Sequence, residues 1–338
     1  MQPAQIVRQL APRFGIQVRR MKVIQDGVFR IVTRNGNTFC LKRMAYPPVR
    51  LRWIDLTLHR LRSKGFKRIA WRNRGSRLGS RLYARGNYPD APPFVLIPWL
   101  KGSFPSPRSN TQMRACGTLL ARFHQAGNRI AIPKAGRHNG LGSWPAYLRS
   151  ERNKMLRSIR KAKRNGFGSP LDSFLQKHGN EILRYANISL RALQSSNYRS
   201  LCRKAKRTLC HGDCGPSNII RTRKGMYLLD FETMRIDLRA YDLYRIIYNS
   251  CKDHRWNFAI ARSILDGYQK VFKLGRSDYR MLKMLLLFPR EACKLIQEYS
   301  RITPRGRLDI LKFFPRTIAN ERRRLAFIKK LDAYARKH

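Results

Sequence analysis

The chain has 338 residues, of which 43% are hydrophobic and 10% aromatic, and its 72 Lys and Arg against 19 Asp and Glu give a formal net charge of +53. This apolar content excludes an unfolded basic tail and is enough for one large domain or two lobes. The charge favours anionic partners, such as nucleic acid, an anionic polymer or a nucleotide phosphate, or is a general surface bias, because the basic residues are spread along the whole chain.

The first hundred residues are rich in predicted strands. Segments 27–33 and 38–44 flank Asn35-Gly36, a dipeptide typical of two-residue hairpin turns. A turn centred there would place Phe29 opposite Lys42 on the neighbouring strand.

A helix is predicted next, because Leu51, Ile54, Leu58 and Leu61 repeat at helical spacing and Gly65 is a plausible stop. Further strands are expected over 80–86 and 93–102. Pro98 and Gly102 interrupt the second of these at the start of a proline-rich stretch, so we place a boundary there. The first lobe then spans residues 1–101 and the second 102–338.

Beyond residue 108 the pattern is mostly helical. Helices are expected over 110–127, 144–166 and near 172–195, 240–272, 278–300 and 306–336. Residues 208–234 are the exception and are predicted to be loop and hairpin. A strand-rich segment followed by helices indicates an α+β protein with a small antiparallel-sheet N-lobe and a larger helical C-lobe.

The cysteines and the longest apolar run bear on the compartment. Seven cysteines without regular spacing are typical of free thiols in a reducing compartment. The N-terminal segment lacks an apolar signal core, and the longest apolar run, residues 284–288, is far too short to span a bilayer. We therefore expect cytoplasmic synthesis and no membrane span.

Scarce carboxylates gather in one segment. Five of the 19 lie within thirty residues, namely Asp213, Asp230, Glu232, Asp237 and Asp242. A hairpin with its turn near Lys224 would place Asn218 opposite Asp230, so that an amide oxygen and a carboxylate converge. Such oxygen ligands suit Mg²⁺. Asp213, in a glycine-broken loop nearby, is placed to orient a hydroxyl and accept its proton.

The order of these residues carries a resemblance. His211-x-Asp213-x4-Asn218, followed by a hairpin and Asp230-Phe231, resembles the aminoglycoside-phosphotransferase and choline-kinase branch of the protein-kinase-like fold. It resembles more closely the CotS family of bacterial spore-coat proteins, which has this fold. The strand around Lys42 and segments 97–102, 119–127 and 237–247 extend the likeness over nearly the whole chain in outline.

The resemblance implies roles for particular residues. It makes Asp213 the catalytic aspartate, Asn218 and Asp230 the Mg²⁺ ligands, and Lys42 the contact to the phosphates of ATP. Asp242 would brace the catalytic loop from the following helix, and His211 would hold that loop by hydrogen bonds.

Three positions depart from the family pattern or stay open. Gly27 is the single glycine of the turn that would cover the phosphates. Asp55 is the only acidic residue in the helix that should supply a carboxylate to Lys42, and it is one methylene shorter than the usual Glu. Glu232 is either a second metal contact or a solvated side chain.

The leading hypothesis is an ATP-dependent phosphotransferase acting on a hydroxyl acceptor, which is a sugar, another small alcohol or a coat-protein side chain. A basic surface would suit an anionic acceptor. Location in the spore coat follows from the resemblance alone.

Four alternatives remain open. In the first, the chain is a kinase-fold scaffold of the spore coat without turnover, and in the second it is a basic nucleic-acid-binding protein. In the third, the carboxylate cluster only neutralises nearby arginines (Arg221, Arg235, Arg239). In the fourth, a zinc site forms from Cys202, Cys210, His211 and Cys214. His124 is expected to be a packing or capping residue.

Overall fold

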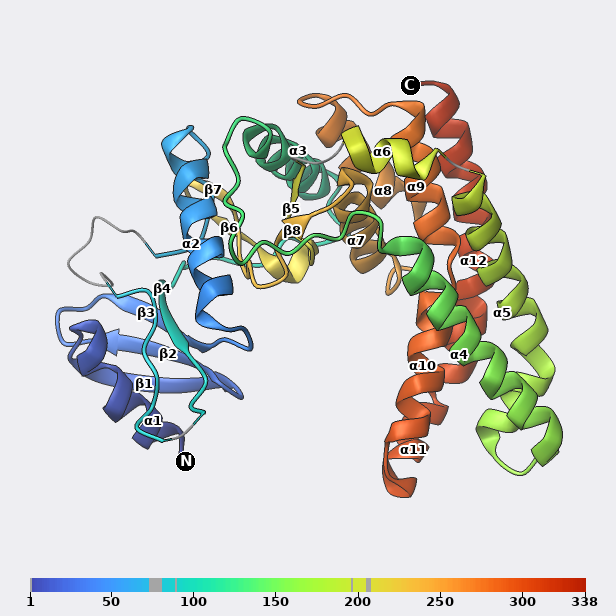
Figure 1. The fold of residues 1–338 in the computed structure, drawn as a ribbon, viewed down its shortest axis with the longest axis horizontal. Coiled ribbons are helices and arrows are strands. Elements are labelled where there is room, and N and C mark those ends of the chain that lie inside the picture. Colours follow the sequence, from blue (N-terminus) through green and yellow to red (C-terminus); the bar gives the residue numbers. More distant parts are fainter. Residues whose placement is uncertain (1, 73–80, 89, 196, 205–207) are drawn as a thin grey trace.

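The computed structural model describes residues 2–72, 81–88, 90–195, 197–204 and 208–338. They form an α+β protein in which a four-stranded antiparallel sheet precedes a larger helical part (Figure 1). The sheet order is β1-β2-β3-β4, with strands β1 (Val18–Gln25), β2 (Val28–Thr33), β3 (Thr38–Arg43) and β4 (Phe94–Pro98). Helix α1 (Pro3–Leu10) shares with this sheet a small apolar core, which includes Leu10, Phe29 and Leu96.

The β2–β3 turn has three residues, not two. Thr33 N–H donates to Asn37 O at 2.9 Å, and Gly36 adopts a left-handed φ of 80°. A type I turn followed by a left-handed residue is the usual form of such a loop. The register therefore shifts by one, and Lys42 lies opposite Val28 instead of Phe29.

Helix α2 (Pro48–Ser63) matches the predicted pattern. Its residues Leu51, Ile54, Leu58 and Leu61 are all fully buried. The chain then runs back toward the helical part, where Ala70 N–H donates to Leu228 O at 2.9 Å.

The strands predicted around β4 are longer than those in the structure. Residue 80 lies outside the described part, and within 81–86 only Ala84 pairs with a strand residue, Phe94. Strand β4 itself ends at Pro98. The lobe boundary at residue 101 stays a prediction. Just beyond it, the backbone N–H groups of Ser103 and Arg221 each donate to the carbonyl oxygen of the other residue. This bridge joins Ser103 to the hairpin of the second lobe and so supports the boundary.

Ten α-helices follow β4 among the described residues. They are α3 (Asn110–Gly127), α4 (Trp144–Asn165), α5 (Pro170–Gln194), α6 (Tyr198–Lys204), α7 (Arg239–Cys251), α8 (Phe258–Gln269), α9 (Arg276–Leu287), α10 (Arg290–Arg301), α11 (Pro304–Leu311) and α12 (Phe313–Arg336). No described helix is both long and apolar enough to cross a bilayer.

Three helices that were predicted as continuous are each split in two. The 240–272 helix breaks where Arg255 and Trp256 take left-handed φ angles of 53° and 54°. The 278–300 helix breaks at Pro289, whose ring cannot continue a helix from the residue before it. The 306–336 helix divides at Lys312.

Four short strands carry the predicted loop-and-hairpin segment. They are β5 (Leu209–Cys210), β6 (Ile219–Thr222), β7 (Gly225–Leu228) and β8 (Arg235–Ile236), with β5 paired to β8 and β6 to β7. In Figure 1 they lie between α2 and α7, which places the segment between the sheet and the helical part.

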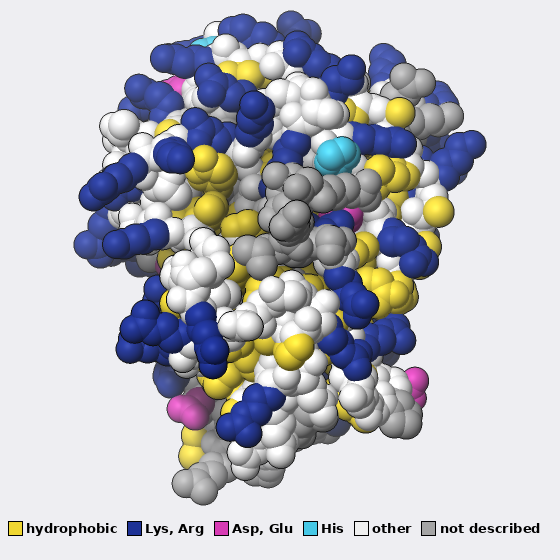
Figure 2. Space-filling view, turned by 90° about the vertical axis from the view of Figure 1, so that its left-hand side faces the viewer, with side chains coloured by type: hydrophobic (Ala, Val, Ile, Leu, Met, Phe, Trp, Pro, Cys, Tyr) yellow, Lys and Arg dark blue, Asp and Glu magenta, His cyan; other side chains and the backbone are white. Residues whose placement is uncertain are grey.

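Lysine and arginine side chains are scattered over the face shown in Figure 2, and acidic side chains are few. The scatter agrees with a general surface bias. All seven cysteines are free, as expected.

Candidate functional site

The loop between β5 and β6 is pressed against the segment that follows β7. Gly212 has a left-handed φ of 89°, and a Cβ there would lie 2.1 Å from the carbonyl oxygen of Thr233. The hydroxyl of Thr233 in turn donates to His211 O at 3.1 Å. Only glycine tolerates both the backbone angle and the close approach.

Asp242 of α7 holds this loop from beneath. Its side chain is fully buried and accepts from the N–H groups of His211 (2.6 Å) and Gly212 (2.8 Å). His124 of α3 bonds the same carboxylate at 3.0 Å through Nε2. Burial alone would raise the pKa of Asp242, but the hydrogen bond with His124, the neighbouring His211 and the N–H of Gly212 lower it below its usual value.

Both imidazoles in this region have their nitrogens engaged. His211 Nε2 bonds Leu229 O at 2.7 Å, and its Nδ1 accepts from Asp213 N–H at 3.4 Å. His124 is fully buried and bonds Tyr268 through Nδ1 at 2.8 Å. These contacts fit the loop-holding role predicted for His211 and the packing role predicted for His124.

Asp213 projects from the loop with 39% of its side chain exposed. Asn218 donates through Nδ2 to Asp213 O (2.7 Å) and Oδ2 (3.2 Å), which leaves the amide oxygen of Asn218 for another partner. Arg245 of α7 pairs with the other oxygen, Oδ1. Sequence reasoning missed Arg245. The available signal was its position three residues after Asp242, on the same face of the predicted helix.

The β6–β7 register differs from the predicted one. The turn has two residues between Thr222 and Gly225, so Asn218 lies opposite Leu229, whose N–H donates to Asn218 O at 2.9 Å. Asp230 comes one position later and has a left-handed φ of 56°, which is uncommon for a residue with a side chain. Direct opposition of Asn218 and Asp230 is therefore wrong, but both residues line the same cavity.

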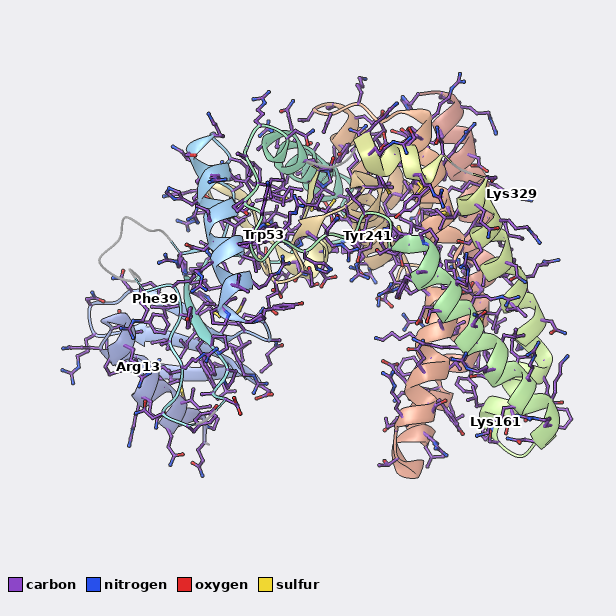
Figure 3. The ribbon with its side chains drawn as sticks, viewed as in Figure 1. Arg13, Phe39, Trp53, Lys161, Tyr241 and Lys329 are labelled. Carbon is purple, nitrogen blue, oxygen red and sulfur yellow. The ribbon has the colours of Figure 1, made fainter. Side chains whose placement is uncertain are left out.

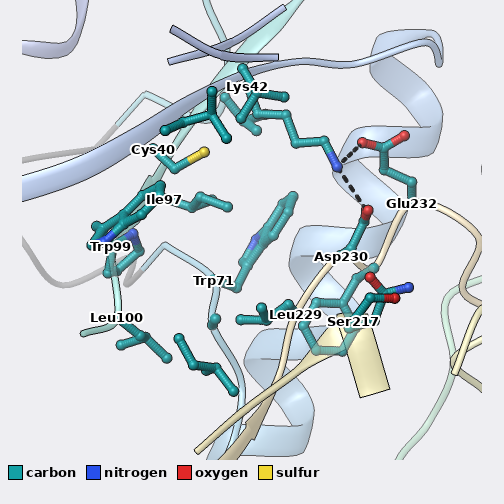
Figure 4. Close-up of a pocket in the computed structure, with 18 of the residues that line it drawn as sticks. Cys40, Lys42, Trp71, Ile97, Trp99, Leu100, Ser217, Leu229, Asp230 and Glu232 are labelled. Atoms are coloured by element: carbon teal, nitrogen blue, oxygen red, sulfur yellow. Dashed lines mark ion pairs between the residues drawn. The ribbon is translucent and has the colours of Figure 1, made fainter. Parts of the chain in front are cut away.

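Lys42 joins the sheet to this segment. Its Nζ lies 2.9 Å from Asp230 Oδ1 and 2.6 Å from Glu232 Oε1 (Figure 4). Burial lowers the pKa of Lys42, but the two carboxylates outweigh it and raise the pKa above its ordinary value. Glu232 is thus a partner of Lys42, a role that neither sequence-based interpretation of this residue included.

Asp55 lies elsewhere. Its carboxylate pairs with Arg72 Nε at 2.8 Å and accepts from Trp71 Nε1 at 2.9 Å, with 2% of the side chain exposed. The structure thus gives Asp55 another cation than the predicted Lys42. Trp71 lines the cavity (Figure 4), so Asp55 supports a cavity wall.

Helix α2 contacts the Asp230 segment through Arg50. The buried guanidinium of Arg50 donates to the carbonyl oxygens of Glu232 (3.3 Å) and Met234. This contact fixes the backbone on which Glu232 and Asp230 stand. Nothing in the spacing of the sequence indicated it.

A cavity of about 430 Å³ lies between the sheet and the β6–β7 hairpin (Figure 4). Its polar end holds Lys42, Asn218, Asp230 and Glu232, and its apolar end is lined by Val28, Cys40, Trp71, Val95, Ile97, Trp99 and Leu100. Pockets of this size and composition are typical of nucleotide-sized ligands.

Gly27 lies in the turn between β1 and β2, next to the cavity residues Gln25 and Val28. It has a left-handed φ of 69°, and a Cβ there would lie 2.8 Å from Arg43 Cβ. The turn therefore requires glycine for its own geometry.

The zinc alternative gains no support. Among the described residues, the one cluster of potential metal ligands is His124, Cys210 and Asp242. His124 and Asp242 already bond each other, and Asp242 also accepts from the backbone of the loop at His211. Burial raises the pKa of Cys210 well above its ordinary value, so its thiol is protonated at neutral pH.

Comparison with known proteins agrees with this geometry. The sequence model of the phosphotransferase enzyme family matches residues 18–282. Spore coat protein S of Bacillus subtilis is 25% identical over 199 residues, which are 56% of this chain and 54% of that protein. The match thus spans about half the length of that relative.

Solved structures extend the likeness to the whole fold. An aminoglycoside phosphotransferase from Alicyclobacillus acidocaldarius has a TM-score of 0.80 at 18% identity, covering 100% of this chain and 97% of that one. An AMP-bound spectinomycin phosphotransferase has a TM-score of 0.62 at 15% identity, covering 95% and 98%. These similarities confirm the predicted kinase-like α+β fold.

Proposed function

The chain belongs to the phosphotransferase enzyme family, and on that premise we propose that it transfers the γ-phosphoryl group of ATP to a hydroxyl acceptor. The observation that carries the proposal is the position of Lys42, which bridges Asp230 and Glu232 at the polar end of a nucleotide-sized cavity. Phosphoryl transfer depends mainly on positioning and charge stabilisation, and this end of the cavity supplies both.

The apolar end of the cavity suits a nucleotide base. Trp99 N–H donates to Thr38 O at 3.1 Å across the β3–β4 ladder. Because bonding directions alternate along a strand, the Pro98 carbonyl and the Leu100 N–H face the opposite side, and both residues line the cavity. An adjacent acceptor and donor fit the edge of a purine.

The oxygen donors fit a magnesium ion. Asn218 keeps its amide oxygen free of Asp213, and Asp230 presents a carboxylate that is 38% exposed beside it in the cavity lining. We propose these two residues as the ligands of Mg²⁺, which takes oxygen ligands and few protein groups. When bound, the ion would neutralise phosphate charge.

Asp213 is proposed to orient the acceptor hydroxyl and accept its proton. It is the exposed carboxylate of the loop, and Asn218 and Arg245 hold its two oxygens. Asp242 and His211 would act only through this loop, as positioning residues.

The test is ATP turnover by the full chain and by Asp213→Asn. A positioned base typically contributes 10²- to 10⁴-fold, so we expect ADP formation to fall by at least about 10² in the variant while its affinity for Mg²⁺·ATP is kept. Equal turnover in both proteins would remove Asp213 from the mechanism.

A second candidate is a spore-coat component without turnover. The similarity to spore coat protein S favours a place in the coat, and the single glycine of the phosphate-covering turn favours weak catalysis. A well-folded chain whose melting temperature does not respond to Mg²⁺·ATP would support this candidate over the first.

A further inference from the structure

The helical part ends in two projections that carry exposed apolar side chains. One is the loop between α4 and α5, where Phe167 is 76% exposed, and the other is α11, where Leu308 is 71% exposed. These are the two most exposed large apolar side chains among the described residues. In Figure 1 both projections point in the same direction from the lower end of the helical part.

Buried aromatic rings tie the two projections together. The ring of Phe174 on α5 lies 4.7 Å from that of Phe314 at the start of α12, measured between centroids. Phe314 is in turn 5.8 Å from the ring of Tyr299, near the end of α10. Ile302 and Phe313, which lie beside these rings in the chain, are exposed. We call the four exposed apolar residues at this end the tip residues: Phe167, Ile302, Leu308 and Phe313.

Cations without acidic partners accompany the tip residues. The last two turns of α4 carry four exposed ones, namely Arg160, Lys161, Lys163 and Arg164. Figure 3 shows Lys161 near this end of the helix. The carboxylates close by in the sequence have other partners, since Glu151 pairs with Lys154 at 2.6 Å and Asp309 with Lys312 at 3.2 Å. Within the described part of the chain, the end of α4 therefore keeps its full positive charge.

This combination of groups fits the interface of an anionic membrane. The headgroups of such a membrane attract Lys and Arg, and apolar side chains that extend beyond the cations enter the acyl boundary, about 5–10 Å deep. A nucleic acid would account for the cations, but Leu308 and Ile302 cannot stack on bases. A protein partner would need a surface shaped to separate projections, whereas lipids adapt to each one.

We propose that the tip residues and the cations at the end of α4 dock this protein on an anionic lipid surface, with Phe167 and Leu308 entering the membrane. None of these residues lines the cavity beside Lys42. The docking surface is therefore separate from the proposed nucleotide site, and it stands whether or not the chain turns over ATP.

The test is co-sedimentation of the full chain with vesicles of phosphatidylcholine, alone or mixed with phosphatidylglycerol, at physiological ionic strength. We expect binding to the mixed vesicles only. Because a net charge of +53 attracts anionic vesicles to every face, two matched pairs of cations are compared. Each cation near an anionic surface strengthens binding about fivefold, so Lys163→Gln with Arg164→Gln should weaken it about 30-fold. Arg20→Gln with Lys22→Gln, on exposed strand β1, should weaken it about twofold or less.

A second set of variants tests insertion of the apolar side chains. Phe167→Ser should weaken binding to the mixed vesicles about tenfold, because it removes the apolar area that enters the membrane, and Phe167→Leu should keep most of the affinity. Val23→Ser, at an exposed apolar position of β1, should leave the affinity unchanged. The fluorescence added by Phe167→Trp should be quenched by lipids brominated on their acyl chains, and that added by Val23→Trp should not.

The outcomes separate insertion at this site from general charge. Equal weakening by the two cation pairs, an unquenched Phe167→Trp, or no binding to the mixed vesicles would overturn the proposal. Loss of binding on neutralising Lys163 and Arg164, with no effect of Phe167→Ser, would overturn it in favour of an anionic polymer at the same end of the molecule. All the substituted side chains are exposed, so we expect each variant to keep the melting temperature of the wild type.

Discussion

Lys42 receives both of its carboxylates from the segment that follows β7. Glu232 and Asp230 lie 2.6 and 2.9 Å from its ammonium, whereas Asp55 of α2 is bound to Arg72 and Trp71. Desolvation raises the pKa of Glu232, and Lys42 opposes that rise. Lys42 therefore stabilises the ionised form of this partly buried carboxylate. Helix α2 still affects the surroundings of Lys42 indirectly, because its Arg50 donates a hydrogen bond to the backbone carbonyl of Glu232.

Two amide substitutions separate these roles. Glu232→Gln leaves Lys42 with one carboxylate, and because a hydrogen bond to a charged group contributes about 1.5–3 kcal/mol, we expect nucleotide affinity or turnover to fall about tenfold or more. Asp55→Asn breaks a buried ion pair, which typically costs about 3–5 kcal/mol of stability, while nucleotide binding at a temperature where the variant is folded stays near wild type.

Calorimetry with ATP and urea denaturation measure the two effects. Nucleotide affinity that depends on Asp55 and not on Glu232 would return the role of partner to helix α2.

The residues in and around the polar end of the cavity differ in how far the sequence predicted them. Lys42, Asp213, Asn218 and Asp230 were indicated by short-range spacing, which survives a register error of one residue. Arg50 was not, because its contact to Met234 joins residues 184 positions apart. No periodicity encodes such a contact, and basic residues are too common in this chain to single one out.

At the scale of elements, the loop that carries Asp213 is held by hydrogen bonds from a neighbouring helix and by one close backbone approach. Asp242 of helix α7 accepts from the loop backbone, His124 of helix α3 bonds Asp242 in turn, and Thr233 lies against Gly212. The loop has little regular structure of its own, so its conformation depends on these contacts.

Asp242 gives this arrangement a pH dependence. Its folded-state pKa lies below the ordinary value of 3.8, so the ionised carboxylate contributes stability above that pH, and the contribution is lost as the pH falls through the folded-state pKa. At pH 7 we expect Asp242→Asn to lower the free energy of unfolding by about 1–3 kcal/mol. Urea denaturation at several pH values should show the difference from wild type shrinking below about pH 4. A difference that grows on acidification would contradict this role.

Gly212 and Gly36 form a matched pair for the backbone. Both have left-handed φ angles, but a Cβ on Gly36 meets nothing within 4 Å, whereas one on Gly212 meets Thr233 O at 2.1 Å. Gly36→Ala should cost about 1–2 kcal/mol, the usual penalty for a left-handed residue. Gly212→Ala should cost clearly more and also reduce turnover. Equal losses of unfolding free energy in the two variants would mean that the loop moves freely to make room.

The predicted elements differ from the observed ones where the backbone conformation of one or two residues decides a turn or a helix end. The hairpin turns were placed within one residue, yet the register depends on whether the loop has two residues or three. The helix near 240–272 was predicted as continuous, since Arg255 and Trp256 give no sign that they take left-handed angles. Tertiary packing decides such points, and local composition does not.

At the scale of the whole molecule, the sheet and the helical part are joined by more than the chain between β4 and α3. Ala70 and Arg68 bond Leu228, so the β6–β7 hairpin, which Asp230 follows, is tied to the N-terminal part by backbone hydrogen bonds. The two-part α+β architecture was predicted from the order of strands and helices, because that order limits the ways in which layers can pack.

The net charge of +53 makes a separate prediction about nucleic acid. Scattered basic side chains should bind DNA without sequence preference, and because such binding releases counterions, affinity should fall by about 10² or more between 50 and 200 mM salt. Affinity for Mg²⁺·ATP, which we propose binds in the partly enclosed cavity beside Lys42, should change far less. Titration of one DNA fragment and its scrambled sequence measures this. Sequence-specific binding that resists salt would favour the nucleic-acid-binding alternative.

We propose that Asp230 and Asn218 bind a divalent ion together with the nucleotide phosphates that Lys42 contacts. Calorimetric titration of the full chain with ATP, with and without Mg²⁺, tests it most directly when Asp230→Asn is measured beside wild type. We expect Mg²⁺ to strengthen ATP binding in wild type and this metal dependence to be lost in Asp230→Asn. Binding that is indifferent to Mg²⁺, or equally strengthened in both proteins, would contradict it.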